Sequence, residues 1–120
     1  MKVQYTEIFK LKVMLDKKGI PHEFLDRSYI DYKKHELQYP FYQIIVYNPN
    51  EEELEDRIIS VVQGHGTYGE SQDLLEIQGC LTEKEYQNGS VLGYLDAKNV
   101  LKRIKKEYFK QLEEVNNESN

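Results

Sequence analysis

The stretch "RIISVVQGHGTYGESQDLLEIQG", residues 57–79, decides between two folds for this chain. Its glycines Gly64, Gly66 and Gly69 have the spacing G-x-G-x-x-G, which in dinucleotide-binding proteins joins a strand to a helix within a parallel sheet. The β-branched residues before Gly64 predict the strand. Only nine residues lie between Gly69 and Gly79, too few for the crossover helix that a parallel sheet needs. We therefore expect a turn between antiparallel strands, whose glycines supply positive φ angles.

The same loop has a second, functional interpretation. Backbone N–H groups in glycine-rich turns form concavities that bind anions, so a small phosphorylated ligand such as a nucleotide signal would fit there, at a subunit boundary. No lysine directly follows the last glycine, which excludes a P-loop. The candidate ligand-binding residues are Gly64, His65, Gly66, Thr67, Tyr68 and Gly69.

The N-terminal half predicts one helix followed by strands. A helix over Tyr5–Lys18 ends at the sequence Gly-Ile-Pro, a helix-stopping order. Its apolar residues surround most of the helix circumference, so it needs cover on two sides, one of which would be another subunit. Residues 22–30 predict a short strand, residues 31–40 a polar loop and residues 41–47 a further strand.

The C-terminal half predicts a short strand at 73–79 and then two helices. Thr82 and Glu85 have the spacing of a capping box, and Asp96 caps a long final helix after an extended or irregular segment at 91–95. On this last helix a stripe about 120° wide contains Ala97, Val100, Leu101, Ile104, Tyr108, Leu112 and Val115. The whole pattern predicts a single α+β domain over residues 1–115 with three or four antiparallel strands, and a disordered polar tail over 116–120.

Composition limits the compartment. Cys80 is the one cysteine of the 120 residues, so no internal disulfide forms and a reducing cytoplasm is expected. No apolar run approaches the ~20 residues that cross a bilayer, and the first residues lack the core of a signal peptide, so we expect no membrane partner. The net charge of −5 argues against unspecific DNA binding.

Catalytic motifs are not evident in the sequence. His22, His35 and His65 do not have the spacing of zinc ligands, and Cys80 lies in an apolar segment typical of a small core residue. We therefore expect a protein that is not an enzyme and needs no cofactor or metal. Scattered carboxylates, such as those of Asp26 and Glu76, leave a metal-dependent nuclease as an alternative.

Charge and tyrosine are unevenly distributed. Residues 51–56, "EEELED", are acidic, while the final helix carries lysines opposite its apolar stripe, with Phe109 near Lys102 and Lys105. Basic residues next to an aromatic ring bind phosphate and stack on a base, or dock on an acidic protein surface. The alternative is a solvated face that pairs with residues 51–56 within the chain or across a dimer. Nucleic acid is the less favoured partner, and the ten tyrosines suit a protein contact surface.

Two segments carry a resemblance to a known group of proteins. They are "GHGTYGESQDLLEIQGCLTEKE", residues 64–85, and "VLGYLDAKNVLKRI", residues 91–104. The pattern of G-x-Y-G, LLEI-x-G-x-L-T and V-x-G-Y-L before a final helix resembles small uncharacterised proteins encoded in phages and prophages of Gram-positive bacteria. Gln78 and Cys80 replace larger apolar residues of that pattern. The resemblance implies a phage setting and brings no catalytic residues.

The leading hypothesis is a phage accessory protein that acts by binding in the host cytoplasm. Its partner would be a bacterial host protein of defence or nucleic-acid processing, which it modulates or inhibits, and it would form a homo-oligomer. The expected partner contacts are Tyr68, Tyr94, Lys102, Arg103 and Phe109. The nucleotide-signal binder and the metal-dependent nuclease are the two alternatives.

Overall fold

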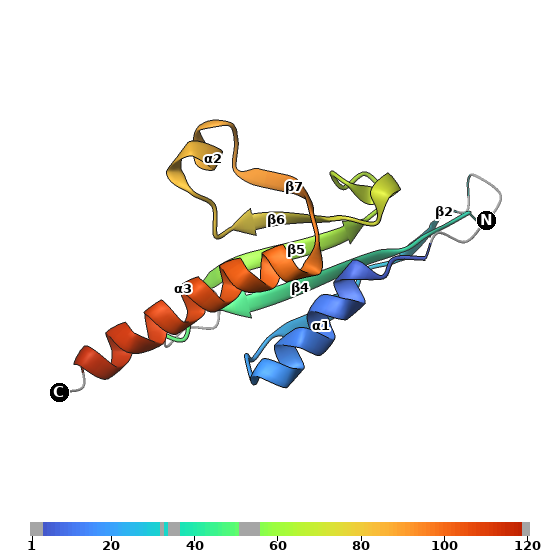
Figure 1. Cartoon of the computed structure of the whole chain (residues 1–120). Coiled ribbons are helices and arrows are strands. Elements are labelled where there is room, and N and C mark those ends of the chain that lie inside the picture. Colours follow the sequence, from blue (N-terminus) through green and yellow to red (C-terminus); the bar gives the residue numbers. More distant parts are fainter. Residues whose placement is uncertain (1–3, 32, 34–36, 51–55, 119–120) are drawn as a thin grey trace.

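A computed structural model describes residues 4–31, 33, 37–50 and 56–118 of the chain (Figure 1). It contains an antiparallel five-stranded sheet of order β1-β4-β5-β6-β7. These strands are β1 (Glu23–Asp26), β4 (Phe41–Tyr47), β5 (Arg57–Gly64), β6 (Leu75–Gly79) and β7 (Val91–Leu95). The helices are α1 (Glu7–Lys18), α2 (Glu83–Gln87) and α3 (Ala97–Glu118). The expected α+β fold is confirmed, with five strands in the sheet rather than three or four.

The additional strand pairings arise in segments that have weak sequence signals. Residues 91–95 form β7 because they pair with β6 at the sheet edge. Residues 22–30 divide into β1 and β2 (Tyr29–Asp31). The sequence predicts a loop over 31–40, but β3 (Leu37–Tyr39) pairs with β2, and the rings of Tyr29 and Tyr39 stack across this pair at 5.1 Å. Cross-strand packing therefore overrides the polar composition of the segment.

The core lies between one face of the sheet and two helices. Figure 1 shows α1 and α3 side by side across that face. Alternate residues of the strands point to it, because successive side chains of a strand face opposite sides. The residues buried here are Ile44, Val46, Ile59, Val61, Leu75 and Ile77 from the strands, Ile8, Leu11 and Leu15 from α1, and Ala97, Val100 and Ile104 from α3. The last three belong to the predicted stripe of the final helix.

The predicted helix caps are present, with one addition. Thr82 and Glu85 form both bonds of the capping box, and Asp96 accepts the backbone N–H of Asn99 at 2.8 Å. The first turn of α1 is capped instead by two residues distant in sequence, Gln63 of β5 and Asp73 of the β5–β6 connection. Asp73 accepts the N–H of Thr6 at 2.9 Å, and Gln63 accepts that of Ile8 at 3.1 Å. These bonds satisfy N–H groups that the helix itself leaves unpaired.

The molecule is elongated. Its extents are 60 × 27 × 24 Å, and its radius of gyration is 15.8 Å, against about 13.6 Å for an average globular chain of this length. The C-terminal part of α3 extends beyond the sheet (Figure 1). This helix continues to Glu118, so residues 116–118 of the expected tail are helical. The last two residues of that tail lie outside the described part of the chain.

Candidate functional site

The glycine loop joins two antiparallel neighbours. β5 and β6 pair directly, and Gly66 and Gly69 have φ angles of +87° and +99°, so the predicted turn with positive φ is confirmed. Gly64 serves a different purpose, because a Cβ there would lie 2.3 Å from Cδ2 of Phe41. Glycine at position 64 thus permits close contact with the neighbouring strand β4.

Three N–H groups of this loop, those of Gly64, Gly66 and Tyr68, are bonded to side chains of the protein itself. The N–H of Tyr68 donates to Glu76 at 3.0 Å, that of Gly66 to Glu70 at 3.4 Å, and that of Gly64 to the hydroxyl of Thr67 at 3.2 Å. The side chain of His65 is exposed, and its ring contacts Tyr39 at 4.5 Å. These three donors are thus occupied, and the carboxylates of Glu70 and Glu76 that accept two of them would repel a phosphate.

The structure brings together two of the predicted contact residues, Tyr68 and Tyr94. The N–H of Tyr94 donates to the carbonyl oxygen of Tyr68 at 3.4 Å. Gly93 allows this approach, because a Cβ there would lie 2.2 Å from Cβ of Tyr68. The two tyrosine side chains are 57% and 58% exposed. We call this pair the tyrosine surface; it joins the two motifs, G-x-Y-G and V-x-G-Y-L, that lie far apart in the sequence.

Tyr94 has a strained backbone. Its φ angle is +62°, in the left-handed region that disfavours bulky side chains and costs roughly 1–2 kcal/mol. The pairing of β6 with β7 shifts register between Leu75 and Ile77, beside this residue. Such irregularities redirect a side chain out of the regular alternation. The ring is mostly exposed, so burial within the described chain does not offset the strain.

Arg103, another predicted contact residue, is engaged within the molecule. Its guanidinium donates two bonds of 2.8 Å to the carboxylate of Glu85, one of 3.1 Å to the carbonyl of Cys80 and one of 2.8 Å to Asn99. These charge-assisted bonds hold the pKa of Glu85 down at about 2. Arg103 therefore ties α3 to the capping box of α2 and does not present a free guanidinium to a partner.

Lys102 and Phe109 lie on α3, apart from the tyrosine surface. Lys102 borders a shallow hollow beside Cys80 and Lys106. Phe109 is exposed and contacts the ring of Tyr108 at 5.6 Å. It lies about 18 Å along the helix from Ala97, at a rise of 1.5 Å per residue. The five predicted contacts thus divide between two places, the tyrosine pair and α3, where Lys102 and Arg103 border the same hollow.

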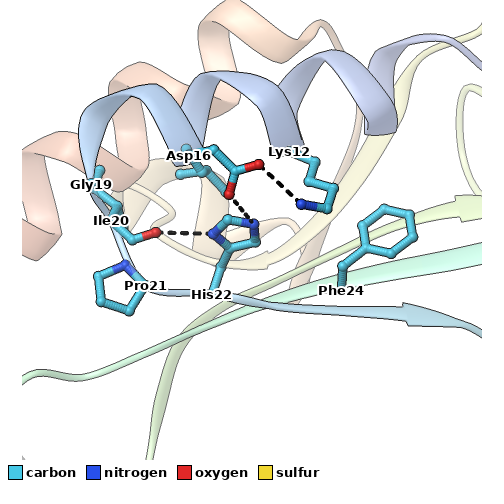
Figure 2. Close-up of a pocket in the computed structure, with 8 residues that line it drawn as sticks. Lys12, Asp16, Gly19, Ile20, Pro21, His22 and Phe24 are labelled. Carbon is cyan, nitrogen blue, oxygen red and sulfur yellow. Dashed lines mark hydrogen bonds and ion pairs between the residues drawn. The ribbon is translucent and has the colours of Figure 1, made fainter.

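A polar hollow at the end of α1 was not indicated by the sequence (Figure 2). Its volume is about 390 Å³. Lys12 and Asp16 form an ion pair of 3.0 Å, and Asp16 lies 3.4 Å from Nε2 of His22. Nδ1 of His22 lies 2.9 Å from the carbonyl oxygen of Ile20. These groups partner one another and fix the turn into β1, so the hollow has a structural explanation.

Other chemical groups give no candidate reaction centre within the described ranges. Burial raises the pKa of the Cys80 thiol to about 12, which keeps it uncharged and weakly nucleophilic at neutral pH. In residues 4–31, 33, 37–50 and 56–118 no three His, Cys, Asp or Glu side chains are grouped to hold a metal ion. Residues 51–55 of the acidic stretch and His35 lie outside the described residues. No helix of the described chain is both long and apolar enough to cross a membrane.

A scan against protein-family models, a search of curated proteins and a search of solved structures each found no match. Evidence on the function is therefore the geometry of the chain itself. In that geometry the tyrosine surface, with its strained and exposed Tyr94, is a feature that internal packing does not explain.

Proposed function

We propose that this protein is a phage accessory factor that binds a bacterial host protein through Tyr68 and Tyr94. The strained backbone of Tyr94, together with the exposure of its ring, carries the proposal. A glycine would occupy the same backbone position without strain. A tyrosine at this position needs a use for its side chain, and its residue is 58% exposed.

The chemistry of the surface fits a protein partner. Tyrosine combines a large apolar ring with a hydroxyl and is enriched among the residues that contribute most to interfaces. The backbone beneath both rings is held by the bond between Tyr94 and Tyr68 and by that between Tyr68 and Glu76. Binding through side chains whose backbone is already ordered loses less conformational entropy. The occupied N–H groups of the glycine loop favour this use of the region over nucleotide binding.

The charge of the chain supports one class of partner. A net charge of −5 speeds association with basic surfaces. Host proteins that process or defend nucleic acid have such surfaces, because they bind phosphate backbones. Together with the resemblance to phage proteins, this supports a nucleic-acid-processing or defence protein of the bacterial host as the partner.

Comparative capture from a Gram-positive bacterial lysate tests the proposal. The immobilised protein would be compared with Y68A, Y94A and the double variant, and Y86A is the matched control because Tyr86 is 61% exposed on α2. We expect the captured protein to be retained by Y86A and reduced by about tenfold or more in the double variant. Equal retention by the double variant, or equal loss in Y86A, would contradict the proposal.

A further inference from the structure

α1 has a second apolar side that the protein's own packing covers only in part. Ile8, Leu11 and Leu15 face the sheet and α3 and are fully buried. On the outer side Val13 is 50% exposed, and Phe9 is 41% exposed although its ring contacts those of Tyr42 at 4.9 Å and Phe24 at 5.6 Å. A helix packed on a sheet normally presents polar residues to solvent. The outer apolar face therefore indicates an interface, as the composition of this helix predicts.

The outer face consists of one row of side chains. Phe9, Val13 and Lys17 follow one another at four-residue intervals, which places them on the same side of the helix. Tyr5, just before the helix and only 6% exposed, lines the same hollow of about 510 Å³ together with Lys10, which is paired with Glu7 at 3.2 Å. The row thus runs from Tyr5 and Phe9 through Val13 to the cation of Lys17. If a second copy lay against this row in the antiparallel direction, Phe9 of each copy would lie opposite Val13 of the other. Lys17 of each copy would likewise lie opposite Tyr5 of the other.

Charges at the two ends of this row are complementary. At the N-terminal end, Glu70 accepts the hydroxyl of Tyr5 at 2.6 Å, and Asp73 accepts the N–H of Thr6. At the C-terminal end, Lys17 has no ion-pair partner among the described residues. Antiparallel pairing brings each Lys17 towards the Glu70 carboxylate of the other copy. It also places opposite ends of the two helix dipoles together.

We propose that α1 pairs with α1 of a second copy of this chain in a two-fold symmetric, antiparallel homodimer, with Phe9 on Val13 and Lys17 on the Tyr5–Glu70 end. Such an interface is isologous, since each copy contributes the same patch. A 12-residue helix is about 18 Å long, which makes this a small interface and a weak, reversible dimer. The tyrosine surface takes no part in it, so this inference is independent of the proposed partner.

Sedimentation equilibrium of the full chain over a micromolar concentration series tests the dimer. We expect the wild type to associate and V13E to stay monomeric at the highest concentration, with unchanged thermal unfolding because Val13 is half exposed. Y86E is the control with a new charge on α2 and should associate as the wild type does. A monomeric wild type, or a V13E variant that associates like the wild type, would overturn the proposal.

Disulfide cross-linking tests the antiparallel arrangement. In a C80A background, an equimolar mixture of F9C and V13C chains should form the mixed disulfide faster than either variant forms its own. Thiols cross-link only when their Cα atoms approach within about 7 Å. Faster self-linking of V13C than of the mixture would indicate parallel helices and overturn the arrangement. K17E should weaken association at low salt. The difference in dimer dissociation constant between K17E and the wild type should then become smaller as salt is added.

Discussion

Asp73 lies far from Thr6 in the sequence, yet its carboxylate accepts hydrogen bonds from the backbone N–H of Thr6, at 2.9 Å, and from the hydroxyl of Thr6. The same carboxylate accepts the amide of Gln63 at 2.8 Å, and Gln63 is fully buried. The loop between β5 and β6 therefore supplies the N-terminal cap of α1. This link holds the helix, whose inner side forms the core, to the loop that presents Tyr68.

Removal of this cap should destabilise the fold. Glycine adopts the backbone conformation at this position, where φ is +55°, without strain. The change in stability of D73G therefore reports mainly the loss of the carboxylate. We expect the free energy of unfolding to fall by about 2 kcal/mol, from a lost cap and an unpaired buried amide. Urea unfolding measures it, with D56G as the control because Asp56 is exposed. Equal losses in both variants would show that the cap contributes nothing.

Stability should depend on Glu85 in the acid range. Arg103 holds the pKa of Glu85 at about 2, below the value of about 4.3 in an unfolded chain. A lowered folded-state pKa contributes stability that is complete above the unfolded pKa and is lost as pH falls through the folded one. The difference in unfolding free energy between wild type and E85Q should thus be constant near pH 7, shrink below about pH 4.5 and vanish near pH 2. A constant difference over this range would contradict the assignment.

Arg103 should matter for stability rather than for partner binding. R103A removes both hydrogen bonds from the guanidinium to the Glu85 carboxylate and leaves that carboxylate without its main partner. We expect a loss of about 2 kcal/mol in the free energy of unfolding. K102A, next to it on the exposed side of α3, should change the free energy by less than about 0.5 kcal/mol. Similar values for the two variants would mean that the ion pair has no net effect.

The sequence predicts much of the fold but less of the candidate surface. Strong local signals predict β4 and β5, the Thr82–Glu85 capping box and the core stripe of α3, and the structure confirms them. The stripe is confirmed as far as Tyr108; Leu112 is outside the core cluster, and the side chain of Val115 lies outside the described part of the chain. β3 and β7 lack such signals, because their pairing depends on neighbours distant in sequence. The contact of Tyr68 with Gly93 and the capping of Thr6 by Asp73 likewise arise only from tertiary packing.

Relief of strain at Tyr94 should separate stability from function. Y94G removes the penalty of the left-handed conformation, partly offset by the greater entropy of an unfolded glycine. We expect the free energy of unfolding to rise by up to about 1 kcal/mol while capture of the partner falls. In Y86G, the same change inside α2 should lower the free energy of unfolding by about 0.5–1 kcal/mol and leave capture of the partner unchanged. A clear loss of stability in Y94G would show that the ring supports the fold.

Photo-crosslinking in living Gram-positive cells tests the tyrosine surface most directly. A benzophenone amino acid would replace Tyr94 in one protein and Tyr86 in another, and adducts would be resolved by mass. We predict a discrete adduct with a bacterial protein from position 94 and none of that mass from position 86. No adduct from position 94, or the same adduct from both positions, would contradict a partner-binding role for this surface.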